Sequence, residues 1–321
     1  MSNNILGIHH VTAIAGDPQR NLDFYTELLG LRLVKLTVNF DDPGTYHLYY
    51  GDDIGHPGTI MTFFLWPGAG RGRRGTGQVT VTSFSVPKGS LGYWMERFKS
   101  QGVVFDESIR RFDEDVLTFF DPDGMALELV ACSDKRSPWK NSPIPYDYAI
   151  RGFYGITITV EGYERTALLL TEVMGFRYVC ESVGRFRYEM GEGGAGTIID
   201  IQCLPYGAMG RVAVGTVHHV AWRVADEDTQ RALRQDIVRF GLNVTPVIDR
   251  KYFHSIYFRE PGRVLFEIAT DPPGFAVDEP PEELGTKLQL PSWLEPSRDK
   301  IEQALPPLRL PKRACSNRSR D

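Results

Sequence analysis

Two short segments, far apart in the chain, place a pair of histidines inside an apolar run. The first reads GIHHVTAIAGD over residues 7–17 and the second reads TVHHVAWRVAD over residues 216–226. Each is typical of a β-strand followed by a polar turn and a helix. Neighbouring side chains of a strand point to opposite faces, so only one histidine of each pair can face a given side. The alternation with Ile8 and Thr12, and with Val217 and Ala221, selects His10 and His219.

A third segment adds a carboxylate to this set. The run VLFEIAT over residues 264–270 places Glu267 in an otherwise apolar strand, where an unpaired buried carboxylate would be costly. Two imidazoles and one carboxylate form the facial triad of non-haem Fe(II) oxygenases, which leaves coordination positions open for substrate and O2. His10, His219 and Glu267 are therefore the candidate metal ligands.

The elements that must position these residues recur along the chain. The order strand, helix, strand, strand, strand can be read four times, and each copy is called a module here. Polar or Pro-rich segments separate the second module from the third and follow the fourth. The predicted divisions are module 1 over 5–66, module 2 over 77–132, a linker over 133–151, module 3 over 152–205, module 4 over 215–271, and a C-terminal tail with one short helix over 272–321.

A single module leaves one face of its sheet uncovered, which favours pairing. We expect an α+β fold in which two modules together form one cup-like, eight-stranded mixed sheet with helices outside, giving two cups in all. Val81 and Gly155 stand in modules 2 and 3 where modules 1 and 4 have His10 and His219. Only the pairing of module 1 with module 4 brings both histidines and Glu267 together. The pairing of modules 2 and 3 would leave a metal-free cup, although Glu128 and Asp200 occupy the acid position there.

Composition narrows the range of functions. The net charge of -5 argues against a nucleic-acid partner, which would need a basic surface. No apolar stretch reaches the roughly 18 residues of a membrane span, so no membrane partner is expected. The cysteines are widely separated and form no CxxC pair, which suits a reducing compartment, and a cytoplasmic location is predicted. A homo-oligomer is expected.

The motifs resemble those of the vicinal-oxygen-chelate superfamily, which includes glyoxalases, bleomycin-resistance proteins and extradiol dioxygenases. The similarity is greatest to ring-cleaving hydroquinone dioxygenases, typified by 2,6-dichlorohydroquinone 1,2-dioxygenase. It is carried by LGIHHVTAIAGDPQRNLDFYTELLG, VPKGSLGYWMERF, VHHVAWRV and DRKYFHSIYFREPGRVLFE, and it covers nearly the whole chain.

This resemblance implies an Fe(II) enzyme, with Mn(II) as the alternative metal, O2 as co-substrate and a small aromatic diol as substrate. It implies that His10, His219 and Glu267 hold the metal and that Tyr257 acts beside it. It also implies supporting roles for His9 and Arg250. Strict alternation points His9 away from His10, so this role requires a β-bulge or a position outside the cup.

Three other functions stay open at this stage. A catechol extradiol dioxygenase would use the same triad. A glyoxalase-like lyase or isomerase would use the same cup but usually has a fourth protein ligand, which Thr62 and Phe63 do not provide. A metal-free binding protein of the resistance type would have no use for the two histidines. His47, His56 and His254 are interpreted as ordinary polar surface or loop residues.

Overall fold

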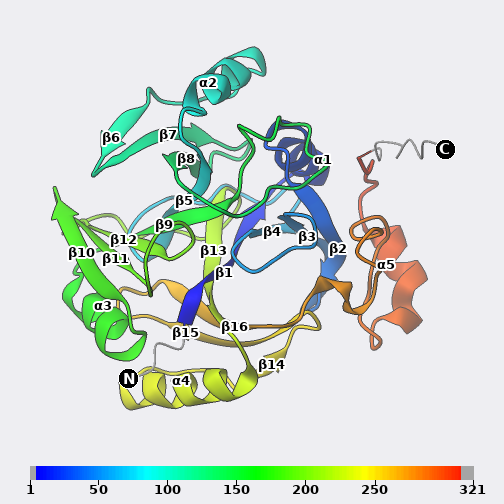
Figure 1. The fold of residues 1–321 in the computed structure, drawn as a ribbon. Coiled ribbons are helices and arrows are strands. Elements are labelled where there is room, and N and C mark those ends of the chain that lie inside the picture. The colour runs from blue at the N-terminus through cyan, green and yellow to red at the C-terminus, as the bar shows by residue number, and fades with distance from the viewer. Residues whose placement is uncertain (1–4, 312–321) are drawn as a thin grey trace.

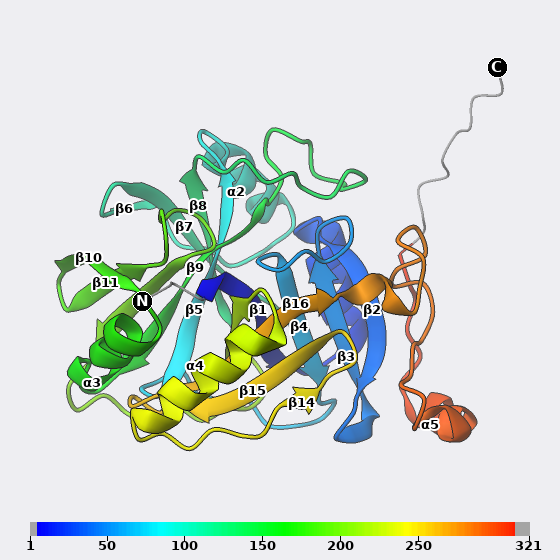
Figure 2. The same ribbon diagram turned by 60° about the horizontal axis from the view of Figure 1, so that its bottom comes forward.

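The computed structural model describes residues 5–311, which form two curved mixed sheets of eight strands each (Figures 1 and 2). The predicted fold class, α+β with two cup-like eight-stranded sheets, is confirmed. The sheet that contains both histidine pairs has the strand order β14-β15-β16-β13-β1-β4-β3-β2. Its strands are β14 (Ile248–Asp249), β15 (Phe253–Arg259), β16 (Leu265–Pro273), β13 (Thr216–Val224), β1 (Ile5–Ala15), β4 (Ile60–Leu65), β3 (Asp42–Gly51) and β2 (Arg32–Asn39).

This sheet, called the histidine cup here, joins strands from the two ends of the sequence. Its centre is the antiparallel pair β1–β13, in which His10 lies opposite Ala221 and Thr12 lies opposite His219. On either side, β4 runs parallel to β1, and β16 runs parallel to β13. The histidine cup therefore combines the strands of residues 5–65 with those of residues 216–273.

The second sheet has the same plan and is called the arginine cup for the side chains described below. Its strand order is β10-β11-β12-β9-β5-β8-β7-β6, with the antiparallel pair β5–β9 at its centre. The strands are β10 (Arg177–Ser182), β11 (Arg185–Glu189), β12 (Ile198–Cys203), β9 (Gly152–Val160), β5 (Gln78–Pro87), β8 (Ala126–Cys132), β7 (Glu114–Phe120) and β6 (Ile109–Arg111). The sequence pattern of modules 2 and 4 predicts strands over residues 103–112 and 242–249, but most of these residues lie outside any strand and only β6 and β14 form there.

The helices lie on the outside of the sheets (Figure 1). They are α1 (Pro18–Asp23) continued by the π-helix η1 (Phe24–Leu28), α2 (Leu91–Ser100), α3 (Glu164–Leu168) continued by the π-helix η2 (Leu169–Val173), and α4 (Glu227–Arg239). The polar turn after each histidine strand has the same purpose in both places. Asp17 accepts a hydrogen bond from the Arg20 amide, and Asp226 accepts one from the Thr229 amide, so each caps a helix N-terminus.

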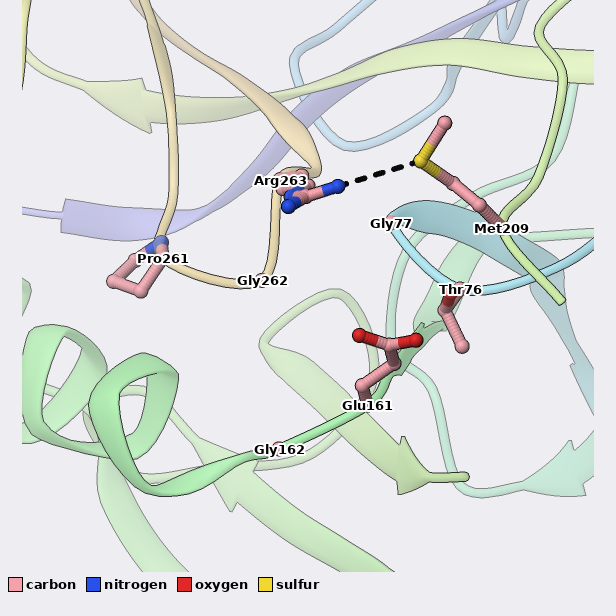
Figure 3. A pocket seen from close by; sticks show the side chains of 8 residues that line it. All are labelled: Thr76, Gly77, Glu161, Gly162, Met209, Pro261, Gly262 and Arg263. Carbon is pink, nitrogen blue, oxygen red and sulfur yellow. Dashed lines mark hydrogen bonds between the residues drawn. The ribbon is translucent and has the colours of Figure 1, made fainter. Parts of the chain in front are cut away.

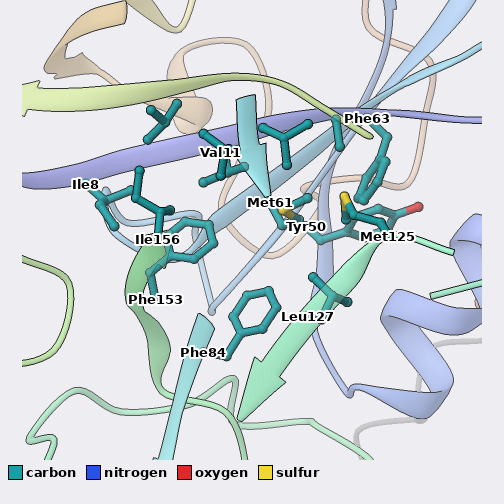
Figure 4. Packing of buried hydrophobic residues seen from close by; sticks show 14 of the residues in the cluster. Ile8, Val11, Tyr50, Met61, Phe63, Phe84, Met125, Leu127, Phe153 and Ile156 are labelled. Carbon is teal, nitrogen blue, oxygen red and sulfur yellow. The ribbon is translucent and has the colours of Figure 1, made fainter. Parts of the chain in front are cut away.

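The two sheets share one apolar core. Strand alternation sends His10 and Thr12 to one face of β1 and Val11 to the other. Val11 packs in a cluster with Phe63 of β4 and with Phe84 and Phe153 of the arginine cup (Figure 4). Because the faces opposite the histidines meet the second sheet and the helices, the histidine faces stay available to line the cup.

The C-terminal segment wraps the β2 side of the histidine cup. It contains the short helices η3 (Phe275–Val277), η4 (Glu295–Ser297) and α5 (Arg298–Ala304). The Lys35 ammonium of β2 is fully buried and pairs with Asp278 at 2.6 Å and with Glu279. The predicted short helix of the tail thus corresponds to α5, and residues 312–321 lie outside the described residues.

Candidate metal centre

Three side chains converge at the centre of the histidine cup. His10 comes from β1, His219 from β13 and Glu267 from β16, and all three are buried. Oε2 of Glu267 lies 3.3 Å from Nε2 of His10 and 2.9 Å from Nε2 of His219, and the two Nε2 atoms are 3.4 Å apart. Within residues 5–311, these form the one group of His, Cys, Asp or Glu side chains whose ligand atoms all lie within 4.8 Å of one another.

The donor set fits a divalent metal ion. Oε2 of Glu267 is buried and faces the Nε2 atoms of both imidazoles. When these rings carry their protons on Nδ1, this oxygen has no hydrogen-bond donor among the described residues, and an unpaired buried carboxylate oxygen is costly. Burial opposes ionisation of Glu267, but the imidazoles of His10 and His219 hold the pKa of this carboxyl well below its usual value. Burial also lowers the pKa of His219. An ionised carboxylate and neutral imidazoles are the forms in which these side chains bind a metal.

The first histidine of each pair orients the second. Nδ1 of His9 lies 2.9 Å from Nδ1 of His10, and Nδ1 of His218 lies 2.7 Å from Nδ1 of His219. Burial lowers the pKa of His9 well below its usual value and that of His218 to about 3, so both rings are neutral and each Nδ1 can accept a hydrogen bond. A proton on Nδ1 of His10 or His219 leaves its Nε2 lone pair free toward the centre of the cup.

A register shift explains how His9 reaches His10. The β1–β13 pairing is irregular between Ile8 and His10, so strict alternation does not hold there. The ring of His9 packs edge-on against that of Phe253 at 5.0 Å and remains buried beside His10. The structure thus brings His9 to His10 through a bulge, the first of the two arrangements expected from the sequence.

A pocket of about 290 Å³ opens from these ligands toward the surface. Tyr257 and Arg250 line it, and Nε of Arg250 donates to the Tyr257 hydroxyl at 3.2 Å. Nη1 of Arg250 also contacts Asp41 of the β2–β3 hairpin at 3.1 Å. Tyr257 pairs directly with Glu267 across β15 and β16. Burial raises the pKa of the Tyr257 hydroxyl, which is therefore a neutral hydrogen-bond donor near the carboxylate.

The interpretation of His47 as a surface or loop residue is wrong. His47 lies in β3 and lines the same pocket. Its Nε2 bonds Oγ1 of Thr62, and its Nδ1 is 3.0 Å from the Tyr49 hydroxyl. His56 is mostly exposed and pairs with Asp52, and His254 is partly exposed and pairs with Glu227, as expected of ordinary polar residues.

The arginine cup holds acids at the position that Glu267 occupies in the histidine cup. Glu128 accepts two hydrogen bonds from Arg111, at 2.8 and 2.7 Å, and one from Ser83. Asp200 accepts from Arg187 at 2.7 and 3.0 Å and from Arg185 at 3.2 Å. These guanidinium groups supply in the arginine cup the positive charge that a metal ion would supply beside Glu267.

Another hollow lies between loops of the two cups and is more open (Figure 3). It has a volume of about 220 Å³, and Glu161 and Arg263 are its charged lining residues. Nη1 of Arg263 contacts Sδ of Met209 at 3.4 Å. The two charged groups come from separate loops, and neither belongs to a group of ligating side chains.

Comparison with known proteins identifies the family. The family model described as the glyoxalase/bleomycin resistance protein/dioxygenase superfamily matches residues 7–129 and 153–276. The chain belongs to this superfamily.

Relatives within the superfamily carry the names of ring-cleaving dioxygenases. One relative is named "Putative ring-cleaving dioxygenase MhqO" and comes from Bacillus subtilis (strain 168). It is 49% identical over 96% of this chain and 98% of its own length. A chlorohydroquinone/hydroquinone 1,2-dioxygenase of Sphingobium indicum is 36% identical over 92% of this chain and 94% of its own. The crystal structure of a "putative dioxygenase" from Bacillus subtilis superposes on this chain with a TM-score of 0.93 at 48% sequence identity. The match covers 97% of this chain and 100% of that chain.

Sequence reasoning missed two residues of this superfamily member's pocket. His218 could have been found from the repeat, because it stands to His219 as His9 stands to His10. His47 gives no such signal, since its contacts depend on how β3 aligns with β4.

Over residues 5–311, none of the helices combines the length and the apolar character needed to cross a membrane.

Proposed function

We propose that this protein is an Fe(II)-dependent dioxygenase that opens the ring of a hydroquinone-type para-diol with O2. The observation that carries the proposal is Oε2 of Glu267, which is buried between the Nε2 atoms of His10 and His219 and has no donor when both rings carry their protons on Nδ1. His10 and His219 in turn line an aromatic pocket. The 36% identical hydroquinone dioxygenase supports the substrate class. Mn(II) is the alternative metal, and a cytoplasmic location and a homo-oligomeric state stay predictions.

In this proposal His10, His219 and Glu267 hold the metal and leave further coordination positions free. When bound there, Fe(II) would lower the pKa of a coordinated hydroxyl and supply the electron transfer between ring and O2. Thr62 is the side chain of β4 that corresponds in register to Glu267 of β16, and a threonine hydroxyl is a poor fourth ligand. This favours an oxygenase over a glyoxalase-like lyase with four protein ligands.

The surrounding side chains have separate roles in the proposal. His9 holds the ring of His10, and His218 holds that of His219, each through Nδ1. The Tyr257 hydroxyl donates a hydrogen bond to negative charge that develops on oxygen beside the ligands, and Arg250 orients this hydroxyl. The aromatic side chains Phe64, Trp66 and Phe253 limit the water around the ring.

The test is anaerobic purification with metal analysis, followed by oxygen uptake with hydroquinone and catechol. We expect one iron per chain and consumption of one O2 per hydroquinone opened, with catechol the poorer substrate. A strong preference for catechol would move the activity to the catechol extradiol class. Turnover of a glutathione adduct with zinc or nickel and without O2 would place the protein with the glyoxalases. Normal ligand binding by metal-free protein would indicate a binding protein of the resistance type.

A further inference from the structure

We propose that the Tyr49 hydroxyl forms a hydrogen bond with the hydroxyl of a para-diol that lies farther from the metal, and that His47 orients the Tyr49 hydroxyl for this contact. The inference rests on the proposed function and deepens it, because it names the group that recognises the second hydroxyl of the substrate. Tyr49 is buried, His47 is partly buried, and both line the pocket that opens from the metal ligands.

The first step is the position of Tyr49 within the repeat. In the pairing of β15 with β16, Tyr257 lies opposite Glu267. In the pairing of β3 with β4, Tyr49 lies opposite Thr62. Since Thr62 corresponds to Glu267, Tyr49 corresponds to Tyr257 on the other half of the cup. The same position holds Thr118 in β7 and Arg187 in β11, so the fold itself does not demand a tyrosine.

The three candidate ligands leave one side of the metal centre open. Glu267 occupies the β16 side, and His10 and His219 occupy the two central strands. The fourth quarter of the cup belongs to β4 and β3, and His47 and Tyr49 of β3 line the same pocket as His10 and His219. A substrate bound at the ligands therefore meets the side chains of this half, which include His47 and Tyr49.

Tyr49, His47 and Thr62 are connected by hydrogen bonds, and aromatic rings pack around them. The Tyr49 hydroxyl lies 3.0 Å from Nδ1 of His47, whose Nε2 bonds Thr62. The ring of His47 packs on those of Tyr49 at 4.1 Å and Phe64 at 4.4 Å. Both nitrogens of His47 are thus engaged, which fixes its ring. A tyrosine hydroxyl has one proton and two lone pairs, so Tyr49 keeps capacity for one further bond whichever partner donates.

The second hydroxyl of a para-diol needs a hydrogen-bond partner in the pocket. A para-diol that binds a metal through one hydroxyl buries the other at the opposite end of its ring, where loss of water without a new partner is costly. The Tyr257 hydroxyl already contacts Arg250, which itself contacts Asp41. The remaining proton of Tyr257 serves the oxygen beside the ligands in the proposed function, so Tyr49 is the tyrosine left for the distal hydroxyl on the β3 side of the cup.

The experiment compares anaerobic binding of hydroquinone and phenol to the Fe(II)-loaded protein by calorimetry. Phenol lacks only the distal hydroxyl, and without O2 neither ligand is turned over. We expect the wild type to bind hydroquinone up to about tenfold more tightly than phenol, the contribution of one neutral hydrogen bond. Tyr49→Phe should bind the two ligands about equally and keep its iron content and its affinity for phenol.

Two further variants test the roles separately. His47→Leu should also lose the preference, while His47→Gln, whose amide can bond both Tyr49 and Thr62, should restore most of it. Tyr50→Phe is the matched control, because the Tyr50 hydroxyl is buried against Asn21 and does not line the pocket. It should keep the wild-type ratio.

The outcomes separate this inference from the proposed function. A wild-type ratio retained in Tyr49→Phe would overturn the assignment of Tyr49 while leaving the para-diol activity intact. A ratio lost in His47→Gln as fully as in His47→Leu would overturn the orienting role of His47. Failure of the wild-type, iron-loaded protein to bind either phenol or hydroquinone would instead overturn the proposed function.

Discussion

His10 and His219 each have two ring nitrogens, and the structure gives the two nitrogens different neighbours. Nδ1 meets a neutral histidine, His9 or His218, and Nε2 meets Glu267. Fixing the tautomer in this way prepares three ligand atoms before any metal arrives. The site is therefore preformed, with one carboxylate oxygen facing the Nε2 atoms of two imidazoles.

The metal ligands can be tested against the acids of the arginine cup. His10→Ala, His219→Ala and Glu267→Ala should each lose most of the bound iron while the protein stays folded. Glu128→Ala and Asp200→Ala should keep their iron. The first leaves Arg111 and the second leaves Arg185 without an acidic partner, so each should lower the free energy of unfolding by about 3–5 kcal/mol. Metal analysis and urea unfolding measure the two effects. Iron loss in Glu128→Ala equal to that in Glu267→Ala would contradict the assignment.

Tyr257 provides a second test at this scale. Tyr257→Phe should retain iron and substrate affinity but lose about 10²–10³ in kcat, the usual effect of removing one donor to developing negative charge. Steady-state kinetics with metal analysis of the same sample measures this. Loss of iron would make Tyr257 a support for the ligands, and an unchanged kcat would reduce it to a packed aromatic.

The candidate ligands could be predicted from the sequence because each depends on local information. Alternation within a strand selects His10 and His219, and the repeat aligns the two strands. His47 could not be predicted, because β2 and β3 pair with irregular register near Val38 and because the partner of His47 lies on another strand. The bulge at His9 is likewise a product of tertiary pairing.

At the scale of the element, buried charges connect segments that are distant in sequence. Lys35 of β2 is fully buried and is neutralised by Asp278 and Glu279 of the C-terminal segment. Asp121, at the turn between β7 and β8, accepts hydrogen bonds from the amides of Asp123 and Met125 and from the Tyr25 hydroxyl of η1. The periodicity of the sequence does not predict such contacts, because their partners lie far apart along the chain.

Lys35→Met should loosen the C-terminal segment. The substitution removes the ion-pair partner of Glu279 and one of the two ammonium groups that pair with Asp278, so we expect the free energy of unfolding to fall by about 3–5 kcal/mol. Lys287→Met is the control, since Lys287 is exposed and its pair with Glu283 should contribute less than about 1 kcal/mol. Urea unfolding compares the two. Equal stabilities of the two variants would show that the buried pair contributes little.

Asp121 predicts a specific pH dependence of stability. Burial raises its pKa to about 7 in the folded protein, above its value of about 3.9 in an unfolded chain. The folded state therefore holds the proton more tightly. The stability that this contributes is complete below about pH 4 and is lost as pH rises toward 7, by up to about 1.4 kcal/mol per pH unit.

Asp121→Asn removes this titration while keeping the side-chain oxygen. The stability of the variant relative to the wild type should rise between about pH 4 and pH 7 and then level off, as measured by urea unfolding at several pH values. A stability difference that does not change with pH would show that Asp121 titrates normally in the folded state.

At the scale of the whole molecule, two cups of one plan have different contents. The four positions corresponding to Glu267 hold Thr62, Glu128, Asp200 and Glu267, and their cross-strand neighbours are Tyr49, Thr118, Arg187 and Tyr257. In the arginine cup arginines neutralise the acids, and in the histidine cup two histidines face the one acid. The cup plan could be predicted from the repeat, because curved sheets built from such modules need a partner. The arginine network could not, since the acids that pair with Arg111, Arg185 and Arg187 lie on other strands.

The most direct test of the account is the fate of labelled oxygen. Iron-loaded protein is given hydroquinone under ¹⁸O2, and the ring-opened product is analysed by mass spectrometry after rapid quenching. We expect the product to retain both atoms of one O2 molecule, and Glu267→Ala to form none of this product. A product with one labelled oxygen or none, or oxidation of hydroquinone to the quinone without ring opening, would contradict it.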